Sequence, residues 1–246
     1  MSVGFDVDVR SAVISYRPAL GEARTSPAHE VSAGQLFSGA PWRTFRWYYG
    51  QRHYSGTYWA ATCRGHVIYE SRLELAVLIL ADFDPQVRRM VAQPFRLRAE
   101  VDGRPRKHVP DFLWDTADGP TVVDVVRAER LTYPKIRLVC EWTRQIVESL
   151  GWPYRIITEP PSVRLTNVRF LAGYRREWLI NQRILNELRS HTGDFVGTRI
   201  SDVERNRCDD ERPLVRAALM HLLWCHELRA DLTKSLRPST VLEAPR

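Results

Sequence analysis

The sequence predicts an α/β protein in which a small mixed sheet carries a helix on each face and a helical module follows. Three observations support this class. Residues 70–83 have apolar side chains at helical spacing, residues 94–126 hold alternating or wholly apolar segments, and residues 134–158 combine an amphipathic helix pattern with a strand pattern. A chain of 246 residues is long enough for such a core and a second module.

The first 40 residues are predicted to form a strand segment and a linker, the first of three regions. Residues 2–17 partly alternate apolar and polar side chains, as a strand or hairpin does. Residues 18–35 are polar and rich in Pro, Ser, Ala and Gly, which predicts a mobile linker. Residues 42–59 mix aromatic residues with arginines, which favours strands packed on the core; a surface for single-stranded nucleic acid is the alternative.

The central region is predicted to run in the order helix, strand, strand, strand, helix, strand. These elements cover residues 70–83, 94–101, 108–114, 121–126, 134–150 and 154–158. Asp102 and Gly103 supply a turn, so the first two strands should form a hairpin. Pro134 at the start of the second helix and Gly151 after its end fix the bounds of that helix.

Residues 163–246 are predicted to form a helical domain. Its helices are expected over residues 176–190, 199–206 and 212–225. The last helix is apolar apart from Arg216 and His221, so it should pack against other elements rather than read bases, and His221 is assigned a packing role and no ligand. Residues 226–243 are compatible with a small hairpin, or wing.

Charge and composition limit the function classes. A formal net charge of +7 favours an anionic partner such as nucleic acid. The four cysteines are scattered without a CxxC pair, so neither structural zinc nor disulfides are expected. The longest apolar run, residues 73–83, is too short to span a bilayer, and the N-terminus lacks the pattern of a signal peptide. We expect a cytoplasmic protein with no membrane association and no small-molecule ligand.

Three carboxylates indicate metal-dependent phosphodiester chemistry. Asp111 and Asp124 lie in predicted apolar strands, where a carboxylate is costly unless a metal ion, a cation or a solvent-lined cleft accompanies it. Glu74 lies deep in the helix at 70–83, with Glu70 on the same face as the exposed alternative. Such carboxylates hold Mg²⁺, with Mn²⁺ as a substitute, and the ion activates water. For either aspartate alone, capping a turn or pairing with an arginine is the structural alternative.

Four segments resemble the TnsA-type endonuclease subunits of heteromeric transposases, especially their actinobacterial relatives. They are YESRLELAVLILADFDPQVRRMVAQPF, RKHVPDFLW, TVVDVV and NVRFLAGYRR, and the resemblance runs from about residue 43 to the C-terminus. It implies a restriction-endonuclease-like domain over residues 41–162 and a winged-helix-like domain over residues 163–246. It also implies Mg²⁺-dependent cutting of double-stranded DNA at transposon ends, beside a DDE-type transposase, with Glu74, Asp111 and Asp124 as the metal ligands.

The resemblance rests on an E…PD…(D/E/Q)xK core, and the lysine position of that core falls on Val126. In a regular strand Asp124 and Val126 share a face, so a lysine there would point toward metal and water, whereas Arg127 points to the opposite face. Arginine is a poor base but can neutralise charge on a phosphate, and a β-bulge would turn Arg127 inward. Lys107 is one of only three lysines in the chain and is the other candidate.

The sequence therefore predicts a Mg²⁺-dependent DNA endonuclease subunit that works in a complex. Its catalytic residues would be Glu74, Asp111, Asp124 and Arg127. One alternative is a DNA-binding or assembly subunit that kept the nuclease fold after losing its lysine. The other is a winged-helix transcription regulator with an α/β sensor domain. In the C-terminal domain, four basic residues are candidates for phosphate contacts or belong to a solvated surface: Arg212, Arg216, Arg229 and Lys234.

Overall fold

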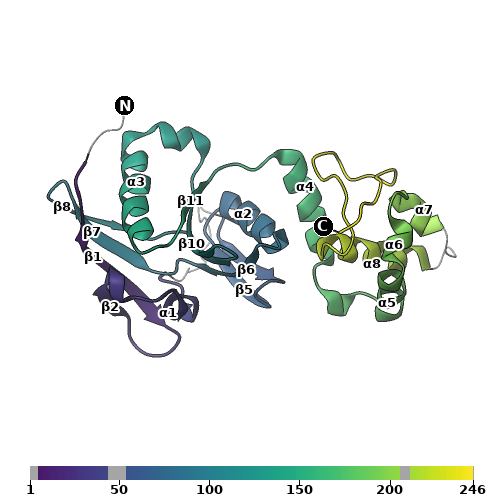
Figure 1. Cartoon of the computed structure of the whole chain (residues 1–246), viewed down its shortest axis with the longest axis horizontal. Helices are drawn as coiled ribbons and strands as arrows, with labels where there is room; N and C mark the ends of the chain where they lie inside the picture. The colour runs from purple at the N-terminus through teal and green to yellow at the C-terminus, as the bar shows by residue number, and fades with distance from the viewer. Residues whose placement is uncertain (1–4, 44–53, 206–210, 246) are drawn as a thin grey trace. The chain divides into compact units, whose positions relative to one another are not determined.

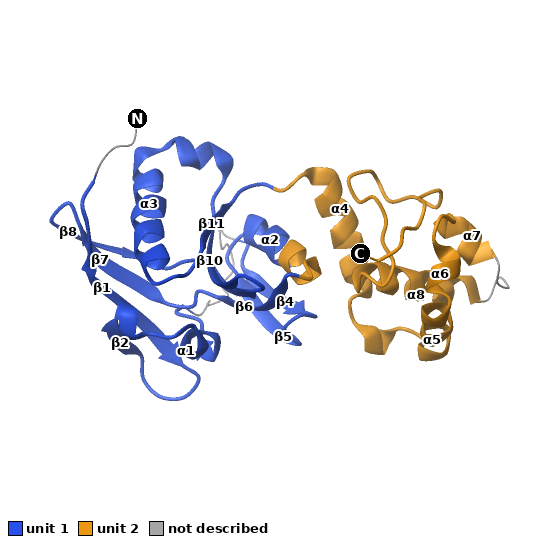
Figure 2. Ribbon diagram, viewed as in Figure 1, with its two compact units in different colours: residues 1–78, 86–159 blue, residues 79–85, 160–246 orange. Residues whose placement is uncertain are grey.

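The computed structural model describes residues 5–43, 54–205 and 211–245 and divides the chain into two compact units. Unit 1 comprises residues 1–78 and 86–159, and unit 2 comprises residues 79–85 and 160–246 (Figure 2). The described part of unit 1 contains the named strands, and unit 2 is largely helical. The predicted α/β class, with antiparallel and mixed sheets flanked by helices, is confirmed.

One sheet of unit 1 is antiparallel, in the order β2-β1-β7-β8, and β3 also pairs with β1. Its strands are β1 (Val7–Pro18), β2 (Arg24–Pro27), β3 (Gly39–Ala40), β7 (Arg96–Val101) and β8 (Arg104–His108). The turn between β7 and β8 has positive φ at Asp102 (51°) and Gly103 (66°). This conformation matches the twist of a two-residue hairpin, as the Asp-Gly pair predicts.

The second sheet of unit 1 is mixed, in the order β11-β10-β9-β6. Its strands are β6 (Val87–Ala92), β9 (Phe112–Thr116), β10 (Gly119–Val125) and β11 (Tyr154–Ile157). β10 runs parallel to β11 and antiparallel to β9, because a helix connects β10 to β11 whereas a short turn connects β9 to β10. A separate hairpin pairs β4 (Gly56–Ala60) with β5 (Gly65–Tyr69).

The main core of unit 1 lies under α3 (Pro134–Ser149), which lies across β1 and β7 in Figure 1. The buried stripe of α3 includes Trp142 and Ile146, and it belongs to the same apolar cluster as Ile14 and Leu97 of the first sheet and Val122 of the second. The other helices of this unit are α1 (Ala33–Phe37) and the first part of α2 (Arg72–Phe83). The helices predicted over residues 70–83 and 134–150 are confirmed as α2 and α3.

Two segments of unit 1 differ from their predicted structure, and β6 lies where the predicted order of elements has no strand. The segment 18–35 is not a mobile linker, because it holds β2, a 3-10 turn and α1, which begins with a capping box between Ser32 and Gln35. The segment 108–114 is not one strand: β8 ends at His108, Pro110 interrupts the pairing, and β9 joins the other sheet. Of the aromatic segment 42–59, residues 44–53 lie outside the described residues, and residues 56–59 belong to β4.

Unit 2 is built around α8 (Arg212–Trp224), where eight residues are buried, as its apolar sequence predicts. The other helices are α4 (Ser162–Leu171), α5 (Gln182–Ser190), α6 (Thr192–Phe195) and α7 (Ile200–Arg205). The sequence patterns missed α4. Residues 226–243 contribute two isolated bridges, Arg199 to Val241 and Arg229 to Glu243, instead of the expected hairpin.

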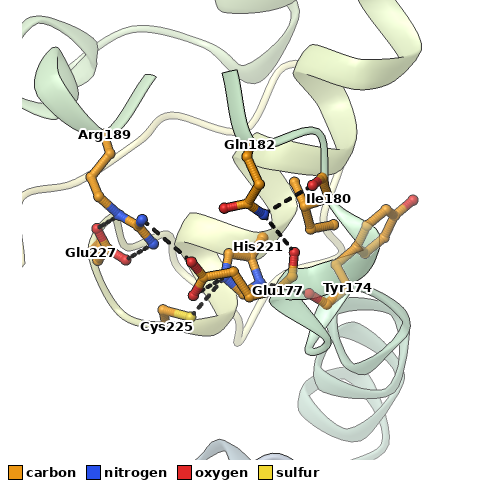
Figure 3. Close-up of polar contacts among 8 residues, drawn as sticks. All are labelled: Tyr174, Glu177, Ile180, Gln182, Arg189, His221, Cys225 and Glu227. Atoms are coloured by element: carbon orange, nitrogen blue, oxygen red, sulfur yellow. Dashed lines mark hydrogen bonds and ion pairs between the residues drawn. The ribbon is translucent and has the colours of Figure 1, made fainter. Parts of the chain in front are cut away.

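A polar network ties α5, α8 and the 3-10 turn at Glu177–Leu179 together (Figure 3). Arg189 binds both carboxylate oxygens of Glu227, at 2.6 and 2.8 Å, and lies 3.6 Å from Glu177. His221 is 1 % exposed; its Nδ1 contacts the Tyr174 carbonyl at 2.7 Å, and its Nε2 lies 3.4 Å from Cys225 Sγ. The packing role predicted for His221 is thus accompanied by hydrogen bonds.

Within residues 5–43, 54–205 and 211–245, every helix is too short or too polar to cross a lipid bilayer.

Candidate active site

A pocket of about 690 Å³ opens on unit 1 beside the start of α2 and the end of β10. Its lining combines two sets of opposite charge. The carboxylates are those of Glu70, Glu74 and Glu129, and the guanidinium groups are those of Arg43, Arg127 and Arg130. Carboxylates attract a cation and arginines attract a phosphate, so the pocket has the charge pattern that a metal-bound phosphodiester requires.

Glu74 lies in the first turn of α2 and lines this pocket. Its carboxylate accepts hydrogen bonds from the backbone N–H of Glu70 at 2.7 Å and the Ser71 hydroxyl at 2.8 Å, while Ser71 Oγ accepts from the Glu74 N–H. Ser71 thus caps the first turn of α2 through its hydroxyl, while the Glu74 carboxylate reaches back to the N–H of the residue before the cap. Burial is the main factor that raises the pKa of Glu74, and the charge of Glu70 adds to it.

Glu70 precedes α2, so it is not one turn earlier on the same helix, as the sequence pattern suggested. Its Oε1 accepts a hydrogen bond from Gln93 Nε2 at 2.7 Å and lies 3.9 Å from Arg43 Nε. Gln93 adopts a positive φ of 48° and is buried, and it also binds the Arg43 N–H, so the loop before β7 holds this side of the pocket in place.

Asp111 lies between β8 and β9, and its Oδ2 accepts the backbone N–H of Val125 at 2.7 Å. Its pKa is raised well above the ordinary value, first by burial and then by the charges of Asp124, Glu74 and Glu70. Charges influence a pKa in this way only over short distances. The charges of Asp124, Glu74 and Glu70 therefore all act on Asp111, and Asp124 Oδ1 also accepts the N–H of Asp111 at 3.2 Å.

Asp124 is 2 % exposed and lies in β10. Its Oδ2 accepts hydrogen bonds from the Tyr154 hydroxyl at 2.5 Å and from His108 Nε2 at 2.7 Å, and its Oδ1 accepts the N–H of Asp111 at 3.2 Å. Burial and the charge of Asp124 raise the pKa of Tyr154 far above its ordinary value, so the phenol keeps its proton and donates.

The face of β10 that lines the pocket is not the face that the sequence predicts. Val126 packs against the core cluster that contains Val122, so the face shared by Asp124 and Val126 meets the core and not a solvent-filled cleft. The pocket lies on the opposite face, where Val125 and Arg127 line it. Arg127 therefore reaches the pocket without a bulge, and its NH1 is 3.9 Å from Glu159. Both faces of β10 are covered within the strand, since Val122 and Val123 are each 0 % exposed, and the pocket opens only at the end of the strand.

Lys107, the other candidate for the missing base, is exposed in β8 and is not among the residues that line this pocket. It pairs with Arg98 across the hairpin, and its neighbour His108 points to the side of the core. The sequence analysis missed His108 and Tyr154. The only local signal was a histidine three residues before Asp111, and Tyr154 lies 30 residues from its partner Asp124.

The fit of a Mg²⁺ ion to these residues is partial. Glu74 offers its carboxylate in the pocket, and the carboxylate of Asp111 binds the N–H of Val125, which lines the pocket. Asp124 fits poorly, because two donors occupy Oδ2 and a third occupies Oδ1. In the part of the chain that the structure describes, no three His, Cys, Asp or Glu side chains are placed to hold a metal ion together. The three-ligand site therefore stays a prediction.

Asp111 should make stability depend on pH in a defined direction. Because its pKa is higher in the folded state than in the unfolded state, its contribution is present at low pH and is lost as pH rises through the folded value. Asp111→Asn cannot titrate, so its stability relative to wild type should increase between pH 4 and pH 8. Urea unfolding at several pH values measures this. The exposed Asp118→Asn is the control, and a difference that is constant across pH would contradict the assignment.

Comparison with known proteins leaves the family unassigned: no protein-family description matches this chain. No curated protein matches it in sequence either.

Proposed function

We propose that this chain is the endonuclease-type subunit of a TnsA-like heteromeric transposase, acting on double-stranded DNA beside a DDE-type transposase. The observation that carries the proposal is that Glu70 and Glu74 line a pocket together with three arginines, while Asp111 binds the N–H of Val125, which also lines it, and Asp124 binds the N–H of Asp111. A buried carboxylate cluster is stabilised by hydrogen-bond donors, by protonation of a member such as Asp111, whose pKa is raised, or by a bound cation, and the proposal assigns the last role to Mg²⁺. Bound Mg²⁺ would activate water and stabilise charge on the phosphate.

The chain's own residues have distinct tasks in this proposal. Glu74 and Asp111 hold the cation, and Arg127, exposed at the rim of the pocket, contacts the phosphate. Arg43 and Arg130 extend the positive rim. Asp124 acts indirectly, because its hydrogen bond to the Asp111 N–H fixes the backbone that presents the Asp111 carboxylate. A winged-helix-like role for unit 2 in DNA binding belongs to the same proposal.

A second candidate is a DNA-binding or assembly subunit that kept the nuclease architecture without cutting. Two observations favour it. The position expected to hold lysine is Val126, packed on the core, and the carboxylate of Asp124 is occupied by three donors. In unit 2, Arg216 and Lys234 pair with Glu204 and Asp231, so these two candidates for phosphate contacts are already compensated.

Plasmid nicking distinguishes the two candidates. We expect the purified protein, alone or with the transposase encoded beside it, to nick supercoiled DNA in Mg²⁺ or Mn²⁺, and Asp111→Asn to reduce the rate at least about 100-fold because a ligand to the ion is weakened. Binding of Mn²⁺, followed by calorimetry, should be lost in the same variant.

The matched control is Asp118→Asn, which removes an exposed carboxylate outside the pocket. Metal binding and DNA binding without cutting would support the assembly subunit instead. Unchanged Mn²⁺ binding in Asp111→Asn would remove Asp111 from the site. A neighbouring gene that does not encode a DDE-type transposase would count against both candidates.

A further inference from the structure

The face of the first sheet that α3 does not cover carries a cluster of positive charge. Strand pairing aligns Ser15 with Arg96, Val13 with Arg98, and Arg98 with Lys107, so these side chains share one face. The opposite face buries Ile14 and Leu97 in the same apolar cluster as the α3 residues Trp142 and Ile146. We call the exposed side the basic face. Its cations are Arg17, Arg96, Arg98 and Lys107, and the same pairing also places the carboxylates of Asp8 and Glu100 on it, so the face keeps a net positive charge.

Trp42 orders two of these cations without neutralising them. The Cζ atom of Arg96 lies 4.6 Å, and that of Arg17 5.7 Å, from the centre of the Trp42 ring. A cation–π contact holds a guanidinium group in position but leaves its charge and its N–H donors available. An ion pair with a carboxylate would instead have neutralised the charge and occupied the N–H donors.

The basic face also lacks the compensation found elsewhere in the protein. Among the described residues, none of its four cations forms an ion pair with a carboxylate, whereas Arg144, Arg183 and Arg189 each pair with two. Arg98 even lies directly opposite Lys107 across the hairpin, an arrangement that costs stability because like charges repel. An anionic partner would offset this cost.

We infer that the basic face binds the phosphate backbone of duplex DNA. The face leads toward the candidate active site, because Trp42 is followed directly by Arg43 at the rim of the pocket. Phosphate contacts position a protein on DNA without reading its sequence, which suits a surface of exposed cations on a rigid sheet. The choice of DNA as the anion rests on the proposed function. The basic face itself is observed in the structure and does not depend on that proposal.

The test compares two double variants of the full chain that remove the same charge. Arg98→Gln/Lys107→Gln changes the basic face, and Lys135→Gln/Arg137→Gln changes two exposed cations of α3, which packs on the other face of the sheet. Fluorescence anisotropy with a labelled duplex of about 30 base pairs, long enough for a typical binding site, gives the affinity at several salt concentrations. Thermal unfolding should show that both variants stay folded: the α3 variant should keep the wild-type midpoint, and Arg98→Gln/Lys107→Gln should have a midpoint at or above it, because the facing like charges are removed.

We expect the slope of log affinity against log salt to become shallower by about 0.9 for each phosphate that the protein no longer neutralises, so by about 1.8 in Arg98→Gln/Lys107→Gln. The α3 variant should keep the wild-type slope. Equal changes in both variants would overturn the inference, because only net charge would then matter. An effect confined to a single-stranded oligonucleotide would overturn the choice of duplex DNA.

The outcomes also separate this inference from the proposed function. If the wild-type protein binds the duplex and Arg98→Gln/Lys107→Gln binds it equally well, the inference fails while a DNA-acting subunit remains supported. If the wild-type protein binds no duplex at all, both fail.

Discussion

Replacing Asp124 by alanine is expected to lower the free energy of unfolding by about 3–5 kcal/mol, because the change removes a buried carboxylate and leaves its partners unpaired. The partners are the Tyr154 hydroxyl, His108 Nε2 and the Asp111 N–H, which would then be left without an acceptor at the junction of the two sheets. Urea unfolding followed by circular dichroism measures the effect.

Two variants make this result informative. Tyr154→Phe removes one donor and leaves the carboxylate paired with His108, so its effect should be smaller, about 1 kcal/mol. Asp118→Ala, on an exposed side chain, should stay within about 0.5 kcal/mol of wild type. A neutral or stabilising Asp124→Ala would show that the carboxylate is strained by its neighbours, as a metal ligand without its ion would be.

A lysine introduced at Val126 and one introduced at Val125 should behave differently. Val126→Lys places an ammonium group against the core cluster and should destabilise the fold by about 1–3 kcal/mol. Val125→Lys places it in the pocket beside Glu70 and Glu74, whose charges compensate it, so the destabilisation should stay below about 1 kcal/mol. The two residues are adjacent and chemically identical, so each variant is the control for the other.

Plasmid nicking should also differ between the two lysine variants. We expect Val125→Lys, and not Val126→Lys, to raise plasmid nicking in Mn²⁺, because only position 125 lies on the face that lines the pocket. If Val126→Lys keeps the wild-type stability and raises nicking, then the buried face of β10 has been assigned incorrectly. If both fold, bind Mn²⁺ and never cut, the assembly subunit becomes the better description.

The elements that the sequence predicts well have local causes. Pro134 and Gly151 fix the ends of α3, and Asp102-Gly103 fixes the hairpin between β7 and β8. The missed strand β6 contains a register shift between Val87 and Arg89, which breaks the period of two on which strand prediction depends.

For the candidate site, too, the sequence predicts the features with a local cause and misses those that depend on distant residues. The sequence identifies the carboxylates, because Asp111 and Asp124 stand out in apolar strands, and the structure brings them near Glu74. A period of two predicts that Asp124 and Val126 share a face but cannot predict which face lines the pocket. That choice depends on α3, and the partners of Asp124 lie 16 and 30 residues away from it in the chain.

The position of β8 at the edge of its sheet also affects how the protein avoids self-association. An edge strand exposes unpaired backbone groups to which a strand of another molecule can add. Here the edge contains Pro105, which lacks an N–H, together with Arg104, Arg106 and Lys107. A second copy pairing along β8 would bring two rows of positive charge together, so the side chains of this strand should keep separate copies from joining edge to edge.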